Sequence, residues 1–144
     1  MTLPFPPAAE RHEASRRLYL ARDLQGYMSF FAPDLTYRRA GGESVTLTQL
    51  TRDVAEQFRR FDSADWSSRT ESEERDGDRV IEIVIQSGTF GATAFGLLRR
   101  EWKLERRARY MWKVHEGRWR IAEVHVLEER LTGSGLKFGR RPIR

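Results

Sequence analysis

The chain has 144 residues, the size of one ordinary domain, and it carries a formal net charge of +5 with an isoelectric point near 10.1. It contains no cysteine, which excludes disulfides and thiolate metal sites. No apolar run approaches the roughly 18 residues that a membrane span needs, and no secretory signal is readable, so the sequence predicts a cytoplasmic protein. Acidic residues interrupt the basic stretches, so we do not expect nucleic acid as a partner.

The first half of the chain predicts helices, because apolar residues recur there at spacings of three and four. In chain order we expect an extended arm over residues 1–8, a helix over 9–24, a short second helix over 24–31 that ends at Ala32-Pro33-Asp34, a strand over 35–39 and a third helix from Thr46. The third helix has the strongest signal, since Gln49 lies three residues after Thr46 and completes a capping box.

After Asp62 the apolar period changes to two, which indicates a meander of antiparallel strands. We expect strands over 65–75, 79–89, 102–115 and 119–128, with turns at Asp76-Gly77 and Glu116-Gly117. The basic, glycine-containing tail over 131–144 is expected to lie outside the domain, which then covers residues 9–130.

Two segments resemble those of a known superfamily. "ARDLQGYMSFFAPDLTY", residues 21–37, resembles the helix turn, second helix and first strand of the nuclear transport factor 2-like (SnoaL-like, ketosteroid isomerase-like) proteins. "YMWKVHEGRWRIAEVHV", residues 110–126, is similar to the final hairpin of that superfamily. The resemblance implies an α+β fold in which three helices pack on the concave face of a curved antiparallel sheet, forming a cone. A cone of this kind offers a concave cavity for a small ligand.

The resemblance also allows a test for the catalytic groups of ketosteroid isomerases. Alignment places Arg39 where the carboxylate base should lie, Ser15 where a tyrosine should lie, and Arg109 near the position of a second acid. An arginine cannot act as a base at ordinary pH, so that mechanism is rejected. No metal site is readable either, because the three histidines fall on three different predicted elements.

Strand parity selects the side chains that would line the cone. On the strand over 102–115 the even positions are mostly apolar, so Arg106 and Tyr110 should face inward with them. On the last strand, Trp119 and Ile121 share a face with Glu123 and His125. The predicted site therefore comprises the candidate catalytic pair His125 and Glu123, and the ligand-binding residues Arg106, Tyr110, Tyr37, Trp66 and Trp119.

Three interpretations of this set stay open. The polar residues could form a structural ion pair between Arg106 and Glu123 with a satisfied core histidine. They could form a ligand site in which Arg106 binds an anion and His125 acts as donor or base. A β-bulge could also reverse the directions of the last strand. The favoured function is a small-molecule-binding domain, acting on a polyketide- or steroid-like ligand, with no cofactor expected.

The same parity predicts a homodimer through the convex sheet face. Ala122, Val124 and Val126 should point outward with Met111, and Val80 and Val84 should join them if Ile81, Ile83 and Ile85 face the core. An apolar outer face of this kind normally is covered by another element. The alternative function is therefore a non-catalytic dimeric interaction module whose cone is closed.

Overall fold

A computed structural model describes residues 3–94 and 98–134. Its helices are α1 (Ala8–Leu20), α2 (Leu24–Met28) and α3 (Leu47–Arg60). Its strands are β1 (Phe31–Arg38), β2 (Ser44–Val45), β3 (Ser63–Asp76), β4 (Arg79–Ala94), β5 (Leu98–His115) and β6 (Arg118–Ser134). The order confirms the predicted α+β architecture. None of the helices in the described ranges is long and apolar enough to span a membrane.

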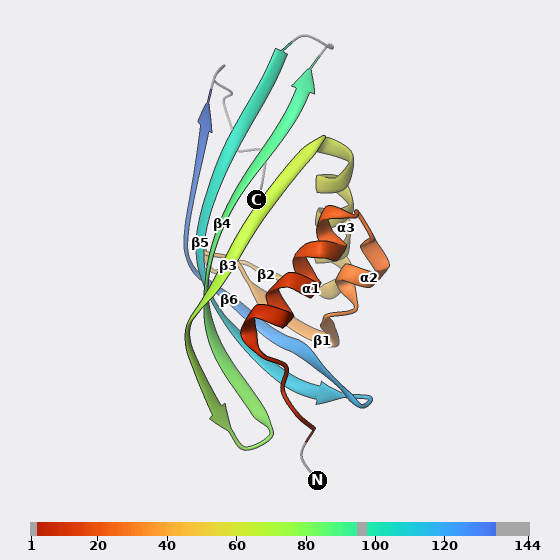
Figure 1. Ribbon diagram of the computed structural model, residues 1–144, viewed down its shortest axis with the longest axis vertical. Helices are drawn as coiled ribbons and strands as arrows, with labels where there is room; N and C mark the ends of the chain where they lie inside the picture. The colour runs from red at the N-terminus through yellow and green to blue at the C-terminus, as the bar shows by residue number, and fades with distance from the viewer. Residues whose placement is uncertain (1–2, 95–97, 135–144) are drawn as a thin grey trace.

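All six strands belong to one sheet in the order β2-β1-β6-β5-β4-β3. Only β1 and β6 pair in parallel, and the other neighbours are antiparallel. The sheet is strongly curved, and all three helices lie on its concave side (Figure 1). The core fills the space between them, and its buried members include Tyr19, Val54, Phe61, Trp112 and Ile121.

Local sequence explains where the helices begin. α1 follows Pro7, whose fixed φ suits the entry to a helix. α3 has the predicted capping box: Thr46 accepts from the Gln49 backbone, and the Gln49 side chain accepts from the Thr46 backbone. The apolar stripe of α3 buries Leu50 and Val54 against the sheet.

Three strands differ from expectation: β1, β2 and β6. β1 begins at Phe31, four residues earlier than predicted, and its pairing with β6 is irregular between Phe31 and Thr36, around Pro33, which has no N–H to donate. The two-residue strand β2 was not predicted, because two residues are too short for any periodicity. β6 reaches Ser134, beyond the expected domain limit at residue 130, and residues 135–144 lie outside the described part of the chain.

The predicted directions on β6 are wrong between two β-bulges. Trp112 pairs with Ile121 but Met111 pairs with Glu123, so Ala122 is an extra residue. Leu127 is extra in the same way, because Ala108 pairs with Val126 and Arg107 with Glu128. Between the bulges, each side chain points to the face of the sheet opposite to the one that strand parity predicts. Val124 and Val126 join the concave core, whereas Glu123 and His125 lie on the convex face with Met111 and Arg109.

The expected directions on β4 are reversed as well. Val80, Glu82 and Val84 are at most 1% exposed and face the core. Ile81, Ile83 and Ile85 pair with Met111, Arg109 and Arg107 on the convex face and keep intermediate exposure. Both sets of positions contain branched apolar residues, so apolar character alone does not decide which set faces the core. Glu82 decides it, because its hydrogen-bond partners lie on the concave side.

Candidate functional site

The concave interior contains a cavity of about 70 Å³ between α1, α3 and the sheet. Its lining combines aromatic and aliphatic side chains with a few polar groups, including Tyr37, Gln86, Arg106 and Tyr110. A second cavity of about 30 Å³ shares Tyr27, Phe31, Trp66, Gln86 and Tyr110 with the first. The two spaces therefore adjoin, on either side of these shared residues.

Among the residues that the structure describes, Arg106 is the only cation in the lining of the larger cavity, and its hydrogen-bond partners there are neutral. Its Nε and Nη2 donate to Oε1 of Gln86 at 3.0 and 2.6 Å, and its Nη1 donates to the Tyr37 hydroxyl at 3.0 Å. Within the described residues no carboxylate forms an ion pair with Arg106 within 4.0 Å. Glu129 is opposite Arg106 in the β5–β6 register, but it acts on the guanidinium only through its electrostatic field.

The electrostatics keep Arg106 charged and the nearby tyrosines neutral. Burial disfavours the guanidinium cation, but Tyr37, Tyr110 and Glu129 outweigh burial and raise the pKa of Arg106 further. Burial raises the pKa of Tyr110 to about 12, although the charge of Arg106 partly opposes it. Burial likewise raises the pKa of Tyr27 well above its ordinary value. At neutral pH the cavity therefore offers a fixed positive charge beside uncharged hydroxyl donors.

The structure places the predicted site residues in two groups. Arg106, Tyr110, Tyr37 and Trp66 line the cavity. Trp119 instead packs against Phe5, with ring centroids 4.9 Å apart, at the end of the sheet near the N-terminal arm. Its Nε1 donates to the Leu3 carbonyl, so it takes no part in the cavity lining.

Glu123 and His125 do not face the cavity, because of the bulge at Ala122. Glu123 is 45% exposed and lies 3.8 Å from Arg109 on the convex face. The expected Arg106–Glu123 ion pair is therefore wrong. A metal site does not emerge either: within residues 3–94 and 98–134, no three histidine or carboxylate side chains are grouped to hold an ion.

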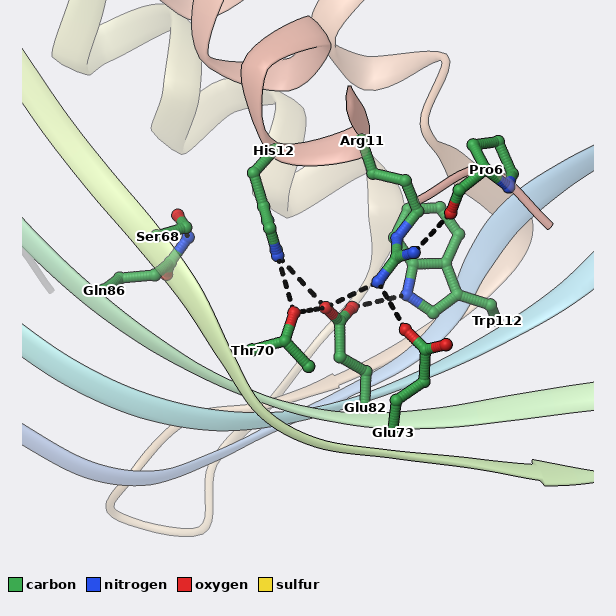
Figure 2. Close-up of polar contacts among 9 residues, drawn as sticks. All are labelled: Pro6, Arg11, His12, Ser68, Thr70, Glu73, Glu82, Gln86 and Trp112. Atoms are coloured by element: carbon green, nitrogen blue, oxygen red, sulfur yellow. Dashed lines mark hydrogen bonds and ion pairs between the residues drawn. The ribbon is translucent and has the colours of Figure 1, made fainter. Parts of the chain in front are cut away.

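A second polar cluster was missed by the sequence reasoning, and Figure 2 shows it around Glu82. Glu82 is fully buried, and its Oε2 accepts from Arg11 at 2.7 Å, from Thr70 at 2.6 Å and from His12 at 3.1 Å. Its Oε1 accepts from Trp112 Nε1 at 3.0 Å. The available signal was a single acid in the apolar run over 79–85, since such an acid needs buried partners if it faces inward.

These donors decide the ionisation of Glu82. Burial alone would raise its pKa, but the hydrogen bonds from His12 and Thr70, the charge of Arg11 and the bond from Trp112 lower it to about 2. The carboxylate is therefore charged throughout the physiological range. Arg11 also bonds Glu73 at 3.0 Å, so one guanidinium serves two carboxylates.

The Glu82 cluster borders a surface groove and an interior cavity. A groove of about 650 Å³ runs beside α1 and the edge strand β3, and its lining includes His12, Arg16, Trp66 and Lys103. His12 also lines the 30 Å³ cavity inside the cone. Its ring therefore forms part of the wall between the groove and the interior.

Comparison with known proteins gives a likeness in structure alone. No family model matches the sequence, and no curated protein matches it. A provisionally assigned scytalone dehydratase from Novosphingobium aromaticivorans superimposes with a TM-score of 0.75 at 11% identity, covering 93% of each chain. An NTF2-like protein from Cytophaga hutchinsonii gives a TM-score of 0.60 at 13% identity, over 82% of this chain and 92% of the other.

A domain with a cystatin-like fold from Nostoc punctiforme gives a TM-score of 0.61 at 10% identity, over 84% of this chain and 78% of the other. Identities this low carry no information on activity. They agree with the curved sheet and the three concave-face helices described above. The chain has the nuclear transport factor 2-like, cystatin-like α+β fold.

Proposed function

We propose that the interior of the cone binds a small, negatively charged ligand and that Arg106 is its anchor. The observation that supports this is a half-buried cation whose partners, Gln86 and Tyr37, are both neutral. A guanidinium away from bulk water is costly unless an opposite charge compensates it. A ligand carboxylate would supply that charge and leave the tyrosine hydroxyls as further donors.

The donor count supports the same ligand class. A guanidinium has five N–H groups, and three hydrogen bonds from Arg106 are accounted for by Gln86 and Tyr37. The rest can point to a carboxylate, which accepts from arginine in a two-pronged geometry. The Tyr37 hydroxyl accepts from Arg106, so its own hydrogen stays available to the same anion.

The volume limits the size of the ligand. A cavity of 70 Å³ corresponds to about two water molecules at the volume of liquid water, or to a ligand of on the order of five non-hydrogen atoms. Cavities for drug-sized molecules measure roughly 300–1,000 Å³. We therefore favour a short carboxylic acid over the polyketide- or steroid-like ligand expected from the sequence, which would require the cavity to widen.

Calorimetric titration with propionate and propionamide tests the proposal, because the two have the same shape and differ in charge. We expect propionate to bind and propionamide not to bind. Arg106→Gln should abolish the propionate signal, whereas the matched variant Arg109→Gln, on the convex face, should leave it unchanged. Equal binding of the two compounds, or full binding by Arg106→Gln, would contradict the proposal.

A second candidate role is a homodimeric interaction module, and one observation favours it. Ile81, Ile83 and Ile85 form an apolar row on the convex face and keep partial exposure. Charges of both signs flank the row in the pairs Arg107–Glu71 and Lys113–Asp34. A surface with both signs can complement a second copy of itself across a twofold axis. Sedimentation at micromolar concentration should then give twice the chain mass.

A further inference from the structure

The hydrogen-bond directions around Glu82 fix the proton on His12. Nε2 of His12 lies 3.1 Å from both Glu82 Oε2 and Thr70 Oγ1. The Thr70 hydroxyl donates its single hydrogen to Glu82 at 2.6 Å, and the ionised carboxylate can only accept. The hydrogen between His12 and Glu82 must therefore belong to Nε2. In the neutral ring, Nδ1 then carries the free lone pair.

The lone pair of Nδ1 remains available. Across residues 3–94 and 98–134, no side chain or backbone group forms a hydrogen bond with it. The His12 side chain keeps 16% of its surface exposed and lines the 650 Å³ groove. Burial of Glu82 and the paired contact at Nε2 hold the ring in one orientation. A fixed imidazole with one nitrogen on a carboxylate and the other free has the geometry of a general base.

The groove offers what a base-catalysed reaction needs besides the base. Its volume of about 650 Å³ falls within the range of small-molecule sites. Ser67 and Ser87 contribute hydroxyls to its lining. The charged side chains of the lining have both signs, with the cations Arg16 and Lys103 and the carboxylates Glu13, Asp65 and Glu105. Arg16 is held in place by Asp65 at 2.7 Å and by the Trp66 carbonyl at 2.9 Å. Because Arg16 is paired with Asp65 and Glu13, the groups of the lining that would stabilise an anion are Lys103 and the serine hydroxyls.

We propose that this groove is a catalytic site, outside the cone, in which His12 removes a proton from a carbon acid, with Glu82 as the positioning residue. The substrate class is a small neutral molecule whose C–H bond is acidified by an adjacent electron-withdrawing group. The C–H bond breaks, its proton passes to Nδ1, and the electron pair stays on the substrate beside Lys103 and the serine hydroxyls of the groove. The resulting imidazolium is stabilised by Glu82 and returns its proton to solvent or product.

The groove site is separate from the ligand site proposed inside the cone. Arg106 lines the interior cavity and not the groove, whereas His12 lines the groove. Failure of one proposal therefore leaves the other in place. The competing explanation is that the cluster only pins α1 to the sheet, through Arg11, His12 and Glu82.

His12→Gln separates these explanations. A glutamine amide N–H can still donate to Glu82, but its carbonyl oxygen is not basic. The variant thus keeps the structural bond and loses the base. His125→Gln and His115→Gln are the matched controls, because they remove the other two histidines from the chain. Circular dichroism and thermal unfolding check that each variant folds.

The probe is 5-nitrobenzisoxazole, a neutral carbon acid that reacts in one step. A base takes the ring C–H proton, the N–O bond breaks, and the electrons form a nitrile and a coloured phenolate. We expect the wild type to accelerate this reaction, and His12→Gln to reduce the acceleration on the order of 100-fold. His125→Gln and His115→Gln should retain the wild-type rate.

A second variant covers the case in which the glutamine disturbs the groove. In His12→Ala, added imidazole should restore the rate. The wild-type rate should rise only by the contribution of free imidazole reacting with the probe in solution. Lack of acceleration by the wild type, an unchanged rate in His12→Gln, or an equal loss in His125→Gln would each overturn the proposal. So would a His12→Ala variant that folds, has lost the rate and does not respond to imidazole.

Discussion

Glu82→Gln is the substitution with the best-defined energetic consequence in this fold. The carboxylate has a pKa of about 2 in the folded protein against 4.5 ordinarily. The difference corresponds to about 3 kcal/mol of stability at neutral pH. Because the folded pKa is lowered, this stabilisation is fully present above about pH 4.5 and is lost as the pH falls toward 2.

Glutamine removes the charge while keeping the shape of the side chain. The carboxylate that remains paired with Arg11 is then Glu73, which is 43% exposed. We expect Glu82→Gln to lower the free energy of unfolding by about 3 kcal/mol at pH 7. At pH 3 the wild type itself should have lost about 2 kcal/mol through Glu82, so the difference between the two proteins should shrink to roughly 1 kcal/mol.

Urea unfolding of both proteins at pH 7, 5 and 3 measures this difference directly. Other carboxylates also titrate in this range, but they do so in both proteins and cancel in the comparison. A difference that stays constant from pH 7 to pH 3 would refute the reasoning, because it would show that Glu82 contributes through shape or packing and not through its charge.

Three further substitutions test the packing and the helix start. Ile83→Glu should shift the expected dimer toward monomer in sedimentation without unfolding the chain, and a wild type that is monomeric at tens of micromolar would contradict the dimer. Val124→Glu should instead prevent stable folding, because Val124 is 2% exposed in the concave core, and a cooperative unfolding transition like that of the wild type would be the contrary result. Thr46→Ala should lower stability by about 1 kcal/mol through loss of the capping box, which urea unfolding can measure.

Features determined by neighbours in sequence were predictable. The Thr46–Gln49 capping box and the turn at Glu116-Gly117 depend on a few adjacent residues, and both occur where expected. Gly117 has a φ of +75°, a conformation that glycine adopts without strain. The order of elements and the resemblance in residues 21–37 and 110–126 were then sufficient for the fold.

Features determined by contacts across the sheet were not predictable. The bulges at Ala122 and Leu127 have no sequence signal of their own, since each is defined by two residues facing one on β5. They account for the wrong directions of Glu123, His125 and Val124. Two partners of Glu82, Arg11 and His12, come from α1, about 70 residues earlier in the chain, so the inward direction of β4 could not follow from its own alternation.

The two bulges on β6 also bear on how this strand tolerates changes in length. Deleting a residue from a central strand normally shifts every pairing beyond it and turns apolar side chains to solvent. Ala122 and Leu127 are exceptions, because each is the unpaired residue of its bulge. Removal of either would leave Ile121, Val124 and Val126 opposite their present partners. β6 therefore has two positions at which evolution can shorten a central strand of the sheet without shifting the strand pairing on either side.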